Sequence, residues 1–153
     1  MLPRQATIEI LRANQGVTSS IVPVTVGAAQ VGNEFQFLVQ ATRRLFWRFT
    51  GVLTLGATGG FRFLAHCTAA PAFYNALFHV EQDTTPAQFF TTQLAEAAFA
   101  NAAAVAEDYS VVASGSVIAG AVDTTFAFQF AQNTSDVLTA TMNAGAVFEC
   151  YYF

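Results

Sequence analysis

The sequence predicts an all-β fold, an antiparallel β-sandwich of jelly-roll type with about eight strands. Three observations carry this prediction. Apolar and polar side chains alternate with a period of two in many short runs, which is typical of strands with one buried face. Gly, Asn, Thr and Ser, which favour turns, separate these runs at short spacing. The chain has 153 residues, a length that fits one domain with a sizeable core.

The beginning of the chain has the weakest pattern. Residues 1–30 alternate only in patches and are interrupted by Pro3, Gly16, Pro23 and Gly27. Proline cannot donate to a β-ladder and is confined to edges and bulges of sheets. We therefore expect an N-terminal arm with one or two short edge strands over 1–30, followed by a single sandwich domain over 31–153.

The alternation strengthens from residue 35. In "TTFAFQFAQ", Phe126, Phe128 and Phe130 share one face of a strand, and the turn-forming "NTSD" follows directly. The same reasoning predicts strands at 35–40, 43–55, 61–67, 73–82, 109–122, 124–132, 137–142 and 145–153.

One Ala-rich segment does not fit the strand pattern. Residues 92–108, "TQLAEAAFANAAAVAED", have high helix propensity, which predicts a short helix near 93–106. The segment has no clear capping residues at its ends, so a strand remains the alternative.

The composition indicates a protein that works in an assembly. Hydrophobic residues make up 54% of the chain and charged residues 10%, against about 45–50% and about 25% in ordinary soluble domains. No apolar run approaches the roughly 18 residues of a membrane span. With only six basic residues and a net charge of −4, the chain is not expected to bind nucleic acid. We expect the excess apolar surface to be buried against other protein chains.

The basic residues suggest where such a contact lies. All six are Arg, the cation that is enriched in protein interfaces, although a preference of the genome for Arg codons explains this equally well. Arg43, Arg44 and Arg48 concentrate around Phe46, and alternation puts Arg44, Phe46 and Arg48 on the outer face of one strand. These four residues are the candidate interface, and a solvated strand face is the alternative.

No motif for catalysis or cofactor binding is evident, so we expect neither an enzyme nor a cofactor. "GATGG" lacks the Lys-Ser/Thr of a phosphate loop, and no "GxSxG" is present. The acidic pairs Glu81/Asp83 and Glu107/Asp108 adjoin strand ends, where solvated carboxylates are ordinary.

The candidate metal ligands are few. His66, Cys67, His79 and Cys150 are scattered along strands instead of being paired at short spacing, so no metal site is expected. The start of the chain lacks a basic segment followed by an apolar one, so secretion is not indicated and reduced, buried thiols are the default. A bridge between Cys67 and Cys150 stays open.

The C-terminal part resembles small structural proteins of tailed bacteriophages. The resemblance rests on "GSVIAGAVDTTFAFQFAQNTSDVLTATMNAGAVFECYYF", residues 115–153, in which "AQNTSD" is the most specific motif. It extends more loosely to "EFQFLVQATRRLFWRFTGVLTLGATGGFRFLA" upstream.

The resemblance implies a virion component with a β-sandwich module that trimerises. It implies a capsid decoration (cement) protein on the outer capsid surface, with the major capsid protein as partner. The alternative is a tip or receptor-binding module of a tail or head fibre. Because a fibre needs an attachment domain and a long shaft, this short chain favours the cement protein.

Overall fold

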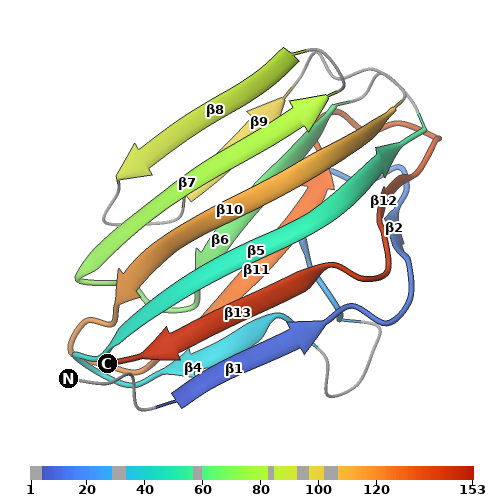
Figure 1. The fold of residues 1–153 in the computed structure, drawn as a ribbon. Helices are drawn as coiled ribbons and strands as arrows, with labels where there is room; N and C mark the ends of the chain where they lie inside the picture. Colours follow the sequence, from blue (N-terminus) through green and yellow to red (C-terminus); the bar gives the residue numbers. More distant parts are fainter. Residues whose placement is uncertain (1–4, 29–33, 57–59, 83–84, 93–96, 102–106) are drawn as a thin grey trace.

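The computed structural model describes residues 5–28, 34–56, 60–82, 85–92, 97–101 and 107–153. Every regular element in these ranges is a β-strand, and the strands form two antiparallel sheets that face each other (Figure 1). The predicted all-β sandwich is confirmed. Within the described ranges there is no helix of the length and apolarity needed to cross a membrane.

The two sheets differ in size. The larger sheet contains β1 (Gln5–Ile10), β2 (Gln15–Val17), β5 (Arg44–Leu55), β7 (Phe73–Gln82), β8 (Thr85–Thr92), β10 (Asp108–Ile118), β12 (Ala140–Met142) and β13 (Val147–Tyr152). The smaller sheet contains β3 (Val24–Thr25), β4 (Gln36–Val39), β6 (Phe61–Cys67), β9 (Ala97–Asn101) and β11 (Thr124–Gln132).

The strand order is that of a jelly roll. The larger sheet runs β1-β13-β5-β10-β7-β8, and the smaller runs β3-β11-β6-β9. The pairs β1 with β13, β3 with β11, β5 with β10 and β6 with β9 are nested, as if one long antiparallel ribbon had been rolled up. The hairpin of β7 and β8 is inserted in the middle of this ribbon and extends the larger sheet.

Each of the eight strands expected from alternation overlaps an observed strand. They correspond to β4, β5, β6, β7, β10, β11, β12 and β13. The run 109–122 ends early, at Ile118, because the chain turns there: Ala119 N donates to Arg43 O, and Gly120 O accepts from Thr42 N.

The helix expected near 93–106 is wrong over Ala97–Asn101. These residues form β9 and pair with β6, from Phe61 opposite Asn101 to Ala65 opposite Ala97. Helix propensity is a weak preference of a few tenths of a kcal/mol per residue, and pairing with an otherwise unpaired sheet edge overrides it. Residues 93–96 and 102–106 lie outside the described part of the chain.

The segment expected as an N-terminal arm contributes three short strands at the margins of the sheets. β1 pairs with β13, β2 with β12 and β3 with β11. Leu11, Val17 and Val26 are at most 5% exposed and belong to the core. The described part of this segment, 5–28, is therefore built into the sandwich instead of preceding it as a separate arm.

The core between the sheets is aromatic, and its centre is Phe128 on β11. The three phenylalanines of β11 all face inward with no exposed surface, as the alternation predicts. The ring of Phe128 stacks on Phe49 at 4.3 Å between centroids. Four further rings lie within 6.4 Å of it, those of Trp47, Phe63, Phe78 and Phe148. Such pairs add to the energy of apolar burial.

The turn after β11 is held by one buried amide, that of Gln132. Its Oε1 accepts hydrogen bonds from the backbone N–H groups of Ser20 and Asp136, each at 3.1 Å. Its Nε2 donates to the carbonyl oxygens of Asp136 and Leu138. Gln132 is only 2% exposed, and its four hydrogen bonds are partly shielded from water.

Gln132→Met is expected to lower the free energy of unfolding by about 2–3 kcal/mol, because the substitution keeps the volume but removes the four hydrogen bonds that this buried amide makes to partly buried backbone groups. Urea unfolding followed by fluorescence measures this change. Gln129→Met is the matched control, since Gln129 is half-buried and its amide makes one 3.4 Å bond to Thr25. Equal effects of the two substitutions would contradict the role assigned to Gln132.

Candidate functional site

The outer face of the larger sheet carries three of the four residues expected at an interface. Arg44, Phe46 and Arg48 alternate along β5 with the buried residues Leu45 and Trp47, and all three are exposed. The period of two along a strand places them on one face, as the sequence predicts.

The first two of these residues pack against one another. The Arg44 guanidinium lies 5.5 Å from the centroid of the Phe46 ring and 6.0 Å from that of Phe73. Phe46 also meets the ring of Phe153 edge to face, at 5.2 Å. Cation–π contacts at exposed sites contribute about 0.5–1 kcal/mol, enough to bias the orientation of these side chains.

Arg48 stands in a row of outward residues that crosses the sheet. Register places it between Glu149 on β13 and Ser114 on β10. The row continues to Ile8 on β1 and to Leu77 on β7. Opposite charges therefore lie side by side near the middle of the sheet, with apolar side chains at both ends of the row.

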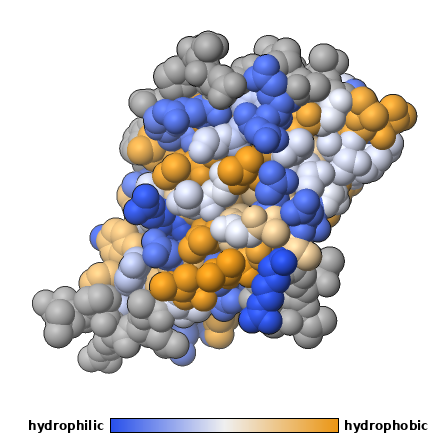
Figure 2. Space-filling model, turned by 45° about the vertical axis from the view of Figure 1, so that its right-hand side comes forward, coloured by the Kyte–Doolittle hydropathy of each residue, from blue (hydrophilic) through white to orange (hydrophobic). Residues whose placement is uncertain are grey.

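Apolar side chains are frequent on this outer face. Besides Phe46, five of them are between 36% and 58% exposed, namely Ile8, Ile10, Val52, Leu77 and Val112. The space-filling view shows apolar groups of this kind interrupted by strongly hydrophilic ones (Figure 2). We call this surface, the outward residues of β1, β13, β5, β10 and β7, the sheet face.

A shallow hollow of about 310 Å³ lies within the sheet face. Its rim includes Phe46, Arg48 and Tyr151. Trp47 and Gly115 also line it. The indole of Trp47 packs closely against Gly115, since a Cβ atom there would lie 2.8 Å from Trp47 Cζ2.

Arg43, the fourth expected interface residue, lies apart from the sheet face. It precedes β5 in the turn after β4 and lines a pocket of about 490 Å³. This pocket lies on the side of the sandwich where β1 ends the larger sheet and β4 pairs on the smaller one. The remaining lining residues are Thr7 from β1, Gln36, Phe37 and Leu38 from β4, Gln40, Tyr152 from β13, and Phe153.

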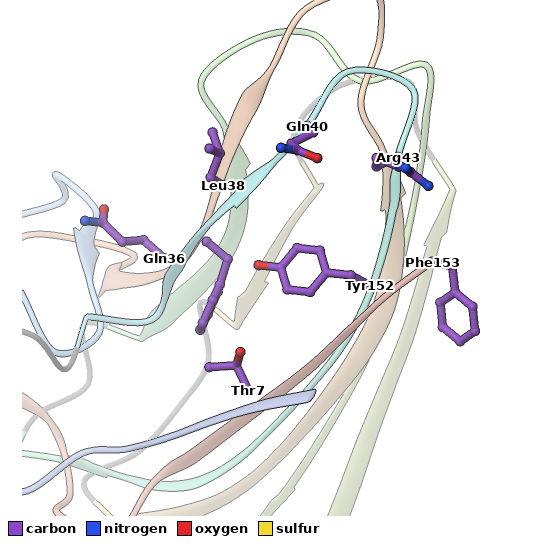
Figure 3. A pocket seen from close by; sticks show the side chains of 8 residues that line it. Thr7, Gln36, Leu38, Gln40, Arg43, Tyr152 and Phe153 are labelled. Atoms are coloured by element: carbon purple, nitrogen blue, oxygen red, sulfur yellow. The ribbon is translucent and has the colours of Figure 1, made fainter. Parts of the chain in front are cut away.

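Tyr152 lies in the middle of this pocket. In the close view its ring lies between Gln40 and Thr7, and its hydroxyl points away from Arg43 and Phe153 (Figure 3). Burial raises the pKa of Tyr152, and the neighbouring Cys150 raises it further. The phenol therefore keeps its proton at neutral pH, and its hydroxyl is hydrogen bonded to Cys150.

Cys150 lies two residues before Tyr152 on β13 and makes hydrogen bonds to Tyr152 and Thr7. Burial raises the pKa of its thiol, and these hydrogen bonds oppose the shift. Both cysteines are buried and neither forms a disulfide bond with a described residue, as expected by default. Cys67 lies opposite Phe126 in the smaller sheet and Cys150 opposite Trp47 in the larger one.

The other candidate groups do not come together. No three His, Cys, Asp or Glu side chains within the described ranges are placed to hold a metal ion. His79 pairs with Glu81 on the same strand, with 2.9 Å between Nε2 and Oε1. Asp108 accepts a hydrogen bond from Thr54 at the end of β10. Asp83 lies outside the described residues.

Fold and surface together define the class: a jelly-roll sandwich with an apolar, Arg-bearing sheet face and a pocket at one side. No protein-family model and no curated protein matches the chain. A chain from the structure of infectious bursal disease virus, Gx strain, aligns with a TM-score of 0.19 and 8% identity. The alignment covers 98% of this chain and 40% of the viral one. This score is too low to establish a shared fold, so the jelly-roll assignment rests on the strand order.

Sequence reasoning found the sheet face but missed the pocket. Alternation along a single strand identifies Arg44, Phe46 and Arg48 directly. The pocket instead brings Thr7 together with Tyr152, residues that lie at opposite ends of the sequence. Only the pairing of β1 with β13 places them side by side. No local pattern in the sequence indicates that pairing.

Proposed function

We propose that this chain is a structural virion protein, a decoration (cement) protein that binds the outside of a phage head and stabilises the shell. Its partner is the major capsid protein, its unit is a homotrimer, and its role is binding without catalysis. The observation that carries the proposal is the sheet face, where exposed apolar side chains surround Arg48 and Glu149.

The composition of the sheet face is that of a surface that binds protein. Phe46, Arg44 and Arg48 belong to the residue types enriched in interfaces, and the chain contains no Lys, which is depleted there. Adjacent opposite charges allow a partner to be selected by complementary potential in addition to apolar burial. The resemblance of residues 115–153 to small virion proteins supports the same assignment.

The start of the chain is not the attachment segment in this proposal. Because residues 5–28 are hydrogen bonded into the sandwich, they are not free to lie across joints between shell subunits. We assign the shell contact to the sheet face. Three linked copies would raise the effective concentration of each contact, and selective binding to the expanded shell would stabilise that shell by mass action.

Leu77→Glu is expected to weaken binding to expanded, empty phage heads at least about tenfold, because burying a carboxylate against an apolar contact carries a desolvation penalty of several kcal/mol. Co-sedimentation of the purified protein with heads measures the affinity. Val137→Glu introduces the same charge at a side chain that is 78% exposed and lies between β11 and β12, outside the strands of the sheet face. Equal losses for both variants, or none for Leu77→Glu, would rule out the sheet face as the contact.

The location on the particle is tested by cryo-electron microscopy of the virion. Density for this chain on the outer capsid, in threefold clusters that bridge shell subunits, is the expected result. Density confined to a tail or fibre would overturn the decoration role and favour a receptor-binding module. Virions that lack the protein are expected to lose resistance to heat, and full retention of packaged DNA and heat resistance would contradict the cementing role.

A further inference from the structure

The pocket beside Tyr152 has the size and lining of a small-ligand site. Its volume of about 490 Å³ falls within the roughly 300–1,000 Å³ of ordinary ligand pockets. Four separate parts of the chain line it, namely β1, β4, the turn after β4, and β13 with Phe153. A site on paired strands of two sheets is held more rigidly than a site on a single loop.

Aromatic rings supply a fixed apolar wall. Phe37 lines the pocket and stacks on the buried ring of Phe148, with 5.0 Å between centroids and 15° between planes. Tyr152 supplies a second ring, and its hydroxyl keeps its proton. Flat rings with a nearby phenol suit a ligand that is itself a ring with an apolar face and a polar edge.

The polar groups of the pocket are mostly uncharged and can both donate and accept. The amide of Gln40 has two donors and an acceptor, that of Gln36 has one N–H and its oxygen left beside the bond to Glu34, and Thr7 has a hydroxyl. Neighbouring hydroxyl groups on a sugar ring also donate and accept, so amides can bind them in pairs. Gln36 is oriented by a hydrogen bond to Glu34.

The charge of the pocket favours a negatively charged ligand. Arg43 is the one charged residue among those that line the pocket, and it lies at the same end as Phe153 (Figure 3). Its side chain is exposed, and its guanidinium presents a planar fork that fits a carboxylate through two parallel hydrogen bonds. In a chain with a net charge of −4, a cationic pocket is a local exception.

We infer that this pocket binds a carboxylated sugar ring, with the ring against Phe37 and Tyr152, its hydroxyl groups on the two amides, and its carboxylate on Arg43. This activity goes beyond shell binding and uses a surface that the sheet face does not include. The two inferences can therefore fail separately.

The test is an NMR titration of the full chain, labelled with ¹⁵N, with three probes. D-Glucuronate is expected to give saturable shifts at Tyr152 and Gln40 with a dissociation constant about millimolar, as befits a ligand of this size. D-Glucose, which has the same ring without the carboxylate, is expected to bind about tenfold more weakly. Acetate, a carboxylate without a ring, is expected to cause no saturable shift at Tyr152.

Substitutions test which side chains bind the carboxylate and which bind the sugar ring. Arg43→Gln is expected to lower the affinity for glucuronate about tenfold and to leave that for glucose unchanged. Tyr152→Phe keeps the ring but removes the hydroxyl. It is expected to lower the affinity for both sugars by about the same factor, which is smaller than tenfold. Arg12→Gln, which removes an arginine that does not line the pocket, is expected to change neither affinity. Circular dichroism confirms that each variant is folded before it is titrated.

Several results would overturn the inference. The absence of saturable shifts with glucuronate on the unmodified chain would do so without any variant. Equal binding of acetate and glucuronate would show an unspecific anion site, and equal binding of glucose and glucuronate would remove the role of Arg43. None of these results bears on the co-sedimentation with phage heads.

Discussion

Replacing Phe128 by alanine is expected to lower the free energy of unfolding by about 4 kcal/mol, within the range of roughly 3–5 kcal/mol for deleting a buried aromatic ring. Phe128 has no exposed surface and lies at the centre of the aromatic core. Its ring stacks on Phe49 and contacts rings from both sheets, among them Phe63 on β6 and Phe78 on β7. The cavity left by the deletion cannot close, because strands hydrogen bonded on both sides hold these rings in place.

Urea unfolding followed by fluorescence measures this loss, and a thermal melt should show the midpoint lowered by roughly 8–16 °C. Phe46→Ala is the matched control, since Phe46 is 37% exposed on the sheet face and its removal leaves no enclosed cavity. We expect the control to cost less than about 1.5 kcal/mol. A loss at Phe128 no larger than that at Phe46 would show that the core is not packed around this ring.

Gly115→Ala is expected to cost about 3 kcal/mol or more, for a different physical reason. A Cβ atom at Gly115 would lie 2.1 Å from the backbone oxygen of Asn75 and 2.8 Å from Cζ2 of Trp47. Overpacking costs about 1–3 kcal/mol where side chains can move, but the Asn75 oxygen belongs to the backbone of the paired strand β7 and cannot move independently. The two strands would have to separate at this point, where Asn75 Oδ1 also accepts hydrogen bonds from the N–H and hydroxyl of Ser116.

The same denaturation experiment measures the cost at Gly115. Ser114→Ala, at the preceding position with its side chain on the sheet face, is the control and is expected to change stability by less than about 0.5 kcal/mol. A second expected effect is a change in Trp fluorescence of the folded state, because the indole of Trp47 lies against this glycine. Wild-type stability together with an unchanged Trp spectrum would contradict the close approach.

Much of the fold could be predicted from the sequence because burial in a sandwich follows the period of a strand. The inward face of β5, with Leu45, Trp47 and Phe49, and that of β11 were both evident from alternation alone. The same period identified Arg44 and Arg48 on the outer face. These are properties of single strands, and each can be read within about ten consecutive residues.

The parts that could not be predicted depend on which strands meet. Ala97–Asn101 has the composition of a helix and becomes a strand because the edge of β6 needs a partner. Nothing in the sequence indicates that the amide of Gln132 makes hydrogen bonds to four backbone groups. Arg43 and Arg44 are consecutive, yet one lines the pocket and the other lies on the sheet face, because β5 begins between them.

The nested pairing of strands has a consequence for the order of events during protein synthesis. Gln5 pairs with Tyr152 and Ile10 with Val147, so β1 has no hydrogen-bonding partner until nearly all of the described chain has left the ribosome. The pairing of β5 with β10 likewise waits for more than fifty residues to be translated. Folds dominated by such distant contacts form slowly, in milliseconds to seconds, and expose unpaired strands meanwhile. An Ile-bearing β1 waiting for its partner is therefore the segment most in need of a molecular chaperone in the cell that makes this protein.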